Sequence, residues 1–268
     1  MGSQAGNLGQ SRKAEQVRSM FAEIAPRYDF LNHTLSLNID RRWRRLVIKA
    51  VAEQLDRPDA AALDLCCGTG DLSLELGAHA RTIGVDFCHP MLRLGMNKIR
   101  DHADAIELIE GDALNVPFSD STFDVVTFWS ALEHTSEPSA NLRQARRIIK
   151  SGGSLIIQLP NAASYQARVF GGEWFALDAP RHRYHFTLSV LNRLLSETGF
   201  EVYRVTYFSK AHNAHALRQS LKSKLLSDDS SFISNALFYL SVPFVKPFDG
   251  LMSVLGKGAT LTVAAYAV

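Results

Sequence analysis

The sequence is poor in cysteine, in net charge and in long apolar runs, and each shortage excludes a class of protein. Its 268 residues include three cysteines, two of them adjacent, which excludes a disulfide framework and suits a reducing compartment. The 29 basic and 27 acidic side chains leave a net charge of +2, which is too weak a field to indicate a nucleic-acid partner. The uncharged, largely apolar run at residues 230–245 is shorter than the roughly 18 to 20 residues of a membrane-spanning helix. We therefore expect a soluble, cytoplasmic protein.

The first part of the chain predicts a helical arm. Residues 1–15 are small and polar, lack an apolar signal segment and are expected to form a flexible lead-in to an arm over residues 16–57. One helix face is apolar, with Trp43, Leu46, Val47, Ala50, Val51 and Leu55 at helical spacing. The other face is basic, with Arg41, Arg42, Arg44, Arg45 and Lys49. This basic face is either an ordinary solvated surface, which we favour, or a patch for anionic lipid or an acidic substrate.

The remainder, residues 58–268, alternates strands with helices. Apolar strands are expected at 61–66, 82–87, 105–110, 123–129, 153–159, 201–209 and 259–268. Helices are expected at 89–102, 139–153 and 188–200. Strands buried on both faces and joined by helices indicate an α/β fold with a doubly wound, mostly parallel, seven-stranded sheet. Residues 161–186 are expected to form an irregular substrate loop. Residues 211–257 are expected to form a helical cap before the last strand, in the place where such folds bind ligands.

A glycine-rich turn follows the first strand in the segment "LDLCCGTGD". Gly68 and Gly70 bracket Thr69, so the chain turns tightly and allows a ligand to approach the backbone. The third glycine of the dinucleotide fingerprint is missing, and Asp71 stands in the first helical turn, where its carboxylate would repel phosphate. A cationic or uncharged nucleoside therefore fits this turn better than a pyrophosphate does.

Acidic residues close the first three strands. Asp64 ends the first strand, Asp86 ends the second, where an acid accepts hydrogen bonds from ribose hydroxyls, and Asp112 ends the third, where it could receive the exocyclic amine of adenine. One such acid is commonly a cap, but three in order indicate a nucleoside site.

These motifs resemble those of the class I S-adenosylmethionine-dependent methyltransferases. The resemblance covers residues 61–160 through "LDLCCGTGD", "GVD", "EGDA" and "FDVVTFWSALEH". Upstream, "VRSMFAEIAPRYDFLNHTLSLNIDRRWRR" looks like the N-terminal signature of the C-methyltransferases that make menaquinone, ubiquinone and phylloquinone. The resemblance implies a Rossmann-like methyltransferase fold, S-adenosyl-L-methionine as cofactor and S-adenosyl-L-homocysteine as product. It implies cofactor contacts from Tyr28, Asp64, Cys66, Gly68, Thr69, Gly70, Asp86, Phe87, Met91, Asp112, Ala113 and Ser130.

The acceptor is expected to be a small apolar aromatic or lipid-like molecule, with a prenylated quinol methylated on carbon as the preferred case. The chain departs from the quinone enzymes after the fourth strand, where Ser130 and Ala131 stand in place of an Arg-Asn pair. O- or N-methylation of another metabolite or lipid therefore stays open, as does cofactor binding without methyl transfer. Peripheral membrane contact and a homodimer also stay open.

Histidine is the side chain best suited to remove a hydroxyl proton near neutral pH. His134, after the fourth strand, is the first candidate for the base, followed by His182 and His185 with Asp178 and Arg181 orienting them. No metal site is expected, because no cysteine or acidic cluster completes the His182/His185 or His212/His215 pairs.

The adjacent thiols of Cys66 and Cys67 are expected to be passive. They stand between Asp64 and Asp71, whose negative charges disfavour a reactive thiolate. The resemblance to class I methyltransferases implies that most of them have glycine at the position of Cys66. The Cys-Cys form of the turn is similar to that of the phylloquinone and menaquinone branch.

Overall fold

The structure is a computed structural model that describes residues 15, 17–25, 39–207, 220 and 250–268. A seven-stranded sheet of order β3-β2-β1-β4-β5-β7-β6 forms its centre. The strands are β1 (Ala61–Leu65), β2 (Arg81–Asp86), β3 (Ile106–Glu110), β4 (Phe123–Trp129), β5 (Ile149–Pro160), β6 (Phe200–Thr206) and β7 (Thr260–Ala267). β1 to β5 pair in parallel, whereas β7 runs antiparallel to both β5 and β6. The predicted doubly wound, mostly parallel sheet is confirmed.

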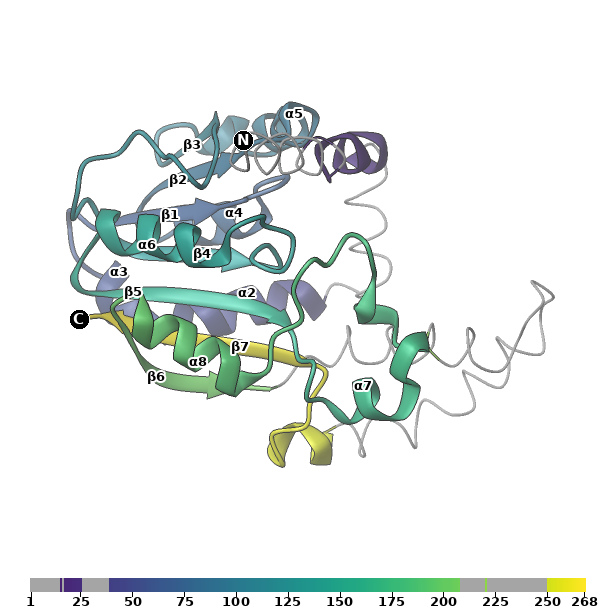
Figure 1. Cartoon of the computed structure of the whole chain (residues 1–268). Helices are drawn as coiled ribbons and strands as arrows, with labels where there is room; N and C mark the ends of the chain where they lie inside the picture. Colours follow the sequence, from purple (N-terminus) through teal and green to yellow (C-terminus); the bar gives the residue numbers. More distant parts are fainter. Residues whose placement is uncertain (1–14, 16, 26–38, 208–219, 221–249) are drawn as a thin grey trace, which may run out of the picture.

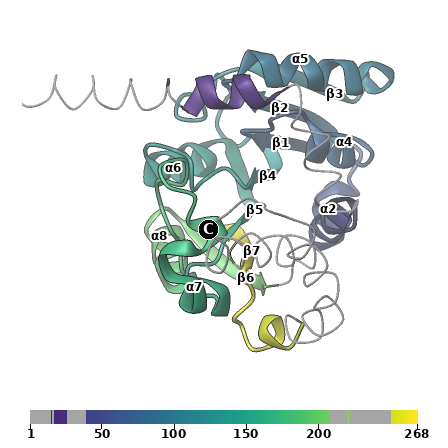
Figure 2. The same cartoon turned by 90° about the vertical axis from the view of Figure 1, so that its right-hand side faces the viewer.

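Helices cover both faces of this sheet. They are α2 (Ile39–Ala50), α3 (Ala52–Leu55), α4 (Asp71–Gly77), α5 (His89–Lys98), α6 (Pro138–Ile148), α7 (Tyr165–Phe170) and α8 (Leu188–Glu197), with short 3-10 turns at Arg100–His102, Gly171–Glu173 and Phe175–Leu177. Seen along its strands in Figure 2, the sheet has α6 and α8 on one side and α2 and α4 on the other. The two main apolar clusters fill the two layers between helices and sheet.

The boundary between α6 and β5 differs from the prediction. The helix was expected to continue to residue 153, but α6 ends at Ile148 and β5 begins at Ile149. Ile148 and Ile149 are both fully buried, so apolar periodicity alone does not mark where the helix ends. β5 is therefore longer than expected and reaches Phe123 at the start of β4.

The described part of the N-terminal arm packs against the sheet and against α5. Val47, Val51 and Leu55 are buried as predicted. Arg44, expected on the solvated basic face, is instead 7% exposed, and its guanidinium lies 3.7 Å from the Asp71 carboxylate. The assignment of Arg44 to the outer face was therefore wrong, because α4 packs against this side of α2. A helical segment at residues 17–25 packs against the start of α5 (Figure 1).

Most of the predicted cap, residues 211–257, lies outside the described residues, so the cap stays a prediction. Of this range, the structure describes Ser220 and residues 250–257, and residues 250–254 are helical. Within the described ranges, no helix combines the length and apolarity that crossing a membrane requires.

Candidate active site

A cavity of about 650 Å³ opens at the carboxyl ends of β1, β2 and β4, where doubly wound sheets bind ligands. Most of the predicted cofactor residues line it: Asp64, Cys66, Gly68, Thr69, Asp86, Phe87, Met91, Asp112, Ala113 and Ser130. Gly70 does not line it, and Tyr28 lies outside the described residues. Asp112 lies two residues beyond β3 and does not end that strand as expected.

The turn after β1 has an unusual backbone that explains its residues. Cys66, Gly68 and Gly70 all have a positive φ, of 58°, 57° and 75°. This region suits glycine and is costly for other residues, so Cys66 adopts a conformation that favours glycine. A Cβ on Gly68 would meet nothing within 4 Å, so the backbone at this point is bare toward open space. The turn can therefore admit a ligand against its main chain.

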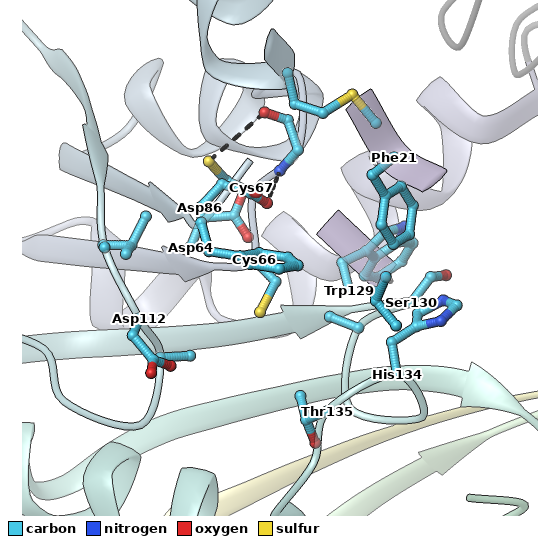
Figure 3. A pocket seen from close by; sticks show the side chains of 18 of the residues that line it. Phe21, Asp64, Cys66, Cys67, Asp86, Asp112, Trp129, Ser130, His134 and Thr135 are labelled. Atoms are coloured by element: carbon cyan, nitrogen blue, oxygen red, sulfur yellow. Dashed lines mark hydrogen bonds between the residues drawn. The ribbon is translucent and has the colours of Figure 1, made fainter. Parts of the chain in front are cut away.

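Asp86 holds this turn to the tip of β2. Its Oδ2 accepts from the amide of Gly68 at 2.8 Å, and its Oδ1 accepts from the amide of Cys88 at 2.8 Å. The carboxyl is 6% exposed, and burial raises its pKa against the lowering effect of these amides. The amide of Phe87 also lowers this pKa by hydrogen bonding, and a carboxylate has about four acceptor sites, so capacity is left to accept a ribose hydroxyl. Figure 3 shows Asp86 beside Asp64 and the two thiols at the centre of the cavity.

Asp64 is buried beneath the same turn. Its carboxylate accepts from the hydroxyls of Ser73 at 2.8 Å and Thr127 at 2.7 Å, which ties β1 to α4 and β4. Burial raises the pKa of Asp64 to about 6, because these two hydroxyls only partly replace the lost water. Asp64 therefore holds together the elements beneath the turn and also forms part of the cavity wall.

Asp71 has cationic neighbours. Its Oδ1 lies 2.8 Å from Nζ of Lys98 on α5, and the same ammonium donates to Oγ1 of Thr69 at 2.8 Å. Lys98 and Arg44 offset the negative charge by which Asp71 was expected to repel a phosphate. The preference for an uncharged or cationic nucleoside therefore cannot rest on this residue.

The thiols have the passive setting that the sequence predicts. Cys66 and Cys67 are free cysteines, and burial raises the pKa of both well above the ordinary value. The next causes are the carboxylate of Asp86 for Cys66 and that of Asp64 for Cys67. Both thiols are therefore protonated at neutral pH and are poor nucleophiles.

His134 lies at the other end of the cavity, with Phe21, Trp129 and Ser130, on the side away from Asp112 (Figure 3). The ring of Phe21 meets that of His134 edge to face at 5.4 Å. Nδ1 of His134 lies 3.0 Å from the carbonyl oxygen of Arg181 and must donate to it, which leaves the lone pair on Nε2. Burial lowers the pKa of His134 to about 4, so the imidazole is neutral at pH 7.

The other predicted catalytic residues lie in the loop before α8 and do not line the cavity. Asp178 accepts from the guanidinium of Arg181, with Nε at 2.7 Å, and its Oδ2 lies 3.9 Å from Nε2 of His182, so the predicted orientation of the histidines by these two residues stays a prediction. His185 is exposed, and its Nε2 donates to the carbonyl of Leu177 at 2.7 Å. The centroid of the His182 ring lies 4.7 Å from that of the His134 ring. Of the two further candidate histidines, His182 is therefore the one that packs against His134.

The sequence reasoning missed Glu133, next to His134. Glu133 is 2% exposed, and burial raises the pKa of its carboxyl to about 8. Its Oε2 is buried with no hydrogen-bond partner within the described part of the chain. An acid a few residues after a strand, as Glu133 is after β4, is commonly a cap, and its burial by a distant loop leaves no local pattern. The available signal was its place at the carboxyl end of β4, beside a histidine.

Comparison with known proteins places these features in a family. Residues 9–166 match the model of the ubiE/COQ5 methyltransferase family. The chain is 37% identical over 153 residues to the "Ubiquinone/menaquinone biosynthesis C-methyltransferase UbiE" of Geobacter sp. (strain M21), covering 55% of this chain and 64% of that protein. It is 37% identical over 148 residues to the "Demethylmenaquinone methyltransferase" of Staphylococcus haemolyticus, covering 54% and 60%. The match thus spans less than two thirds of these relatives.

Solved structures support the fold at lower identity. The geranyl diphosphate C-methyltransferase of Streptomyces coelicolor A3(2), solved with S-adenosyl-L-homocysteine, superposes with a TM-score of 0.56 and 14% identity over 85% of this chain and 80% of that chain. The [4+2]-cyclase SpnF superposes with a TM-score of 0.57 and 18% identity over 83% and 80%. The family model covers more than half of the sequence, and the chain belongs to the ubiE/COQ5 methyltransferase family.

Proposed function

We propose that the protein is an S-adenosyl-L-methionine-dependent methyltransferase that acts on an apolar small molecule, most favourably a prenylated quinol methylated on a ring carbon. The observation that carries the proposal is one cavity with two unlike ends. The turn at Gly68 and the acids Asp86 and Asp112 form one end, and Phe21 and His134 form the other. Family membership and the relatives named for quinone methylation support the same reading.

The residues at the first end suit the cofactor. The bare backbone at Gly68 leaves room for a ligand, and Asp86 has free lone pairs for ribose hydroxyls. The protonated thiols of Cys66 and Cys67 add small, weakly polar walls that do not compete as nucleophiles. When bound, the cofactor supplies a sulfonium methyl group that is intrinsically electrophilic, so the protein mainly aligns the acceptor and excludes water.

The residues at the second end suit an aromatic acceptor. Phe21 and Trp129 offer ring faces and edges for an aromatic ligand. Methylation of a ring carbon leaves that carbon with both the new methyl group and its hydrogen, and the ring recovers aromaticity when the hydrogen leaves as a proton. Nε2 of His134 holds a lone pair that can accept this proton.

The test is an incubation of the pure protein with methyl-labelled cofactor and a reduced, demethylated, prenylated quinol. We expect labelled quinol in the organic phase, formed together with S-adenosyl-L-homocysteine. The labelled product is then treated with a reagent that cleaves ethers. A C-methyl group survives this treatment and an O-methyl group does not, so the treatment identifies the methylated atom. Loss of the label on ether cleavage would show that the enzyme methylates oxygen and not carbon.

A second function, binding of the cofactor without methyl transfer, is favoured by one specific observation. The [4+2]-cyclase SpnF shares this fold, so the fold does not by itself fix the reaction. Under this alternative, the protein binds the cofactor but releases no S-adenosyl-L-homocysteine with quinols, phenols or amines. Turnover with any of these acceptors would exclude it.

A further inference from the structure

Three side chains that could ligate a metal ion meet beside the cavity. Glu133 and His134 follow β4, and His182 belongs to the loop before α8. One ligand atom from each lies within 4.8 Å of the other two. His134 is the member that lines the cavity, so the cluster stands at the end proposed for the acceptor. No sequence spacing predicts this group, because the loop brings its third member from a distant part of the chain.

The two histidines present the nitrogen that a metal would need. Nδ1 of His134 donates to the carbonyl of Arg181 at 3.0 Å, and Nδ1 of His182 donates to the carbonyl of Ala176 at 2.8 Å. In each ring, this leaves the lone pair on Nε2. Histidines that bind metals almost always donate their second nitrogen to such an oxygen, which fixes the tautomer and the ring orientation.

Glu133 supplies a buried carboxyl with unused binding capacity. Its Oε2 is fully buried and has no hydrogen-bond partner among the described residues, and no ion pair to it occurs among them. Buried carboxylates in proteins are normally paired with a cation or coordinate a metal. Two imidazoles and one such oxygen form a donor set with room for a cation.

The backbone fixes the two segments that carry the cluster. The amides of Arg183 and Tyr184 both donate to the carbonyl oxygen of Glu133, at 2.8 and 3.2 Å. The hydroxyl of Tyr184 donates to the carbonyl of Ser136 at 3.0 Å. These contacts hold the loop of His182 against the turn of Glu133 and His134 and so keep the three donors near one another.

We propose that Glu133, His134 and His182 form a site for a divalent first-row transition cation of the zinc type. Imidazole nitrogens with one carboxylate suit zinc, iron or nickel, whereas magnesium and calcium prefer sites made only of oxygen. Asp178 is a nearby alternative donor, since its Oδ2 lies 3.9 Å from Nε2 of His182, whereas its Oδ1 accepts from Arg181. Coordination at about 2.0–2.2 Å draws the three donors closer together than they now lie.

The role of the ion rests on the function proposed above. Three protein ligands leave an open coordination position, as in catalytic zinc sites. Because His134 borders the cavity, a hydroxyl oxygen of the acceptor can take that position. The ion would then orient the acceptor ring and ease the loss of the hydroxyl proton to water. With the ion bound, Nε2 of His134 would be a ligand and not the base, so water would take the protons that the acceptor releases.

The experiment measures metal binding without cofactor or acceptor. The whole protein is stripped with a chelator, dialysed and titrated with zinc chloride by calorimetry, and with cobalt chloride by visible absorption. We expect one zinc per chain, a cobalt spectrum of nitrogen and oxygen ligation, and a rise in melting temperature with zinc. Glu133→Gln and His182→Ala should each weaken zinc binding at least ~100-fold. His89→Ala, which removes an exposed histidine 3.1 Å from Glu110, is the matched control and should bind as the wild type does.

Two outcomes overturn the proposal. One is the absence of saturable zinc binding to the wild type at micromolar concentration, and this result depends on no variant. The other is zinc binding by well-folded Glu133→Gln and His182→Ala variants that equals that of the wild type. The proposed function is judged separately by the labelled-methyl assay, so zinc binding without quinol methylation would keep the site and reject the acceptor.

Discussion

The amide of Gly68 donates to Oδ2 of Asp86 at 2.8 Å, which joins the turn after β1 to the tip of β2. One carboxylate thus shapes the main chain on which a ligand would rest and also faces that ligand. Asp86→Ala removes both effects, and we expect cofactor affinity to fall ~10- to 100-fold, as for loss of a charge-assisted hydrogen bond. Calorimetric titration with S-adenosyl-L-methionine measures the dissociation constant, and urea unfolding reports any loss of stability. An unaltered dissociation constant would contradict the ribose assignment.

Gly68 and Gly152 make a matched pair for testing the turn. Both have a positive φ, of 57° and 73°, and a Cβ on either would meet nothing within 4 Å. Replacement by alanine should therefore lower the free energy of unfolding by a similar amount, about 1–2 kcal/mol, through backbone strain. Only Gly68→Ala places its methyl group in the cavity, so only this variant should lose cofactor affinity. Equal affinities in the two variants would mean that nothing binds against this backbone.

Cys66→Gly should be tolerated. With φ at 58°, Cys66 bears the strain of a left-handed conformation, about 1–2 kcal/mol, which glycine relieves at an entropic cost of about 0.5–1 kcal/mol. The net change in the free energy of unfolding is expected to stay within about 1 kcal/mol, with affinity and turnover close to wild type. Loss of turnover with retained binding would show that the thiol takes part in the reaction.

Because the pKa of Asp64 is raised in the folded state, we expect the free energy of unfolding to depend on pH. Its pKa rises from 3.8 to about 6 on folding, mainly through burial, so the folded state holds this proton more tightly than the unfolded state does. The stability that depends on this proton is complete below pH 3.8 and is lost as the pH rises through about 6, by about 3 kcal/mol in all. Asp64→Asn should abolish this loss.

The check for Asp64 is the free energy of unfolding by urea between pH 4 and pH 8. The difference between Asp64→Asn and wild type should grow in favour of the variant up to about pH 6 and then level off. Asp101→Asn, an exposed acid-to-amide change on the 3-10 turn after α5, is the control. A difference that stays constant with pH would contradict the raised pKa.

His134→Gln should lower kcat while the dissociation constant of the cofactor stays near wild type. The change removes the Nε2 lone pair at the acceptor end, and loss of a positioned acid or base costs about 10²- to 10⁴-fold in rate. Single-turnover transfer of labelled methyl measures the rate. His102→Gln, on an exposed 3-10 turn away from the cavity lining, should leave the rate unaltered. A similar rate in both variants would remove His134 from the mechanism.

The predictable features of this molecule depend on near neighbours in sequence. The strands, the turn at Gly68 and the acid at Asp86 follow from apolar runs and glycine spacing, and the structure places them together at one cavity. The end of α6 was mispredicted because Ile148 and Ile149 are equally buried. Arg44 was misplaced because its environment is α4, which residue periodicity within α2 does not report.

The cluster of Glu133, His134 and His182 could not be predicted from neighbouring residues in the sequence. The contact between Nδ1 of His134 and the carbonyl of Arg181 joins residues 47 positions apart, and the burial of Glu133 follows from the same loop. Polar clusters built by long-range contacts leave only single residues in the sequence, and each of these is commonly structural on its own.

The place of β7 affects the order in which the protein can be completed during synthesis. β7 is the last strand in the sequence but lies between β5 and β6, and it is the strand through which β6 joins the described sheet. While the ribosome is still making residues 260–267, β5 exposes an open edge and β6 has no place in the sheet. Open edges of this kind invite pairing with other chains. The nascent chain is therefore most exposed to aggregation just before its last strand emerges, when the cavity walls from β1, β2 and β4 have already been made.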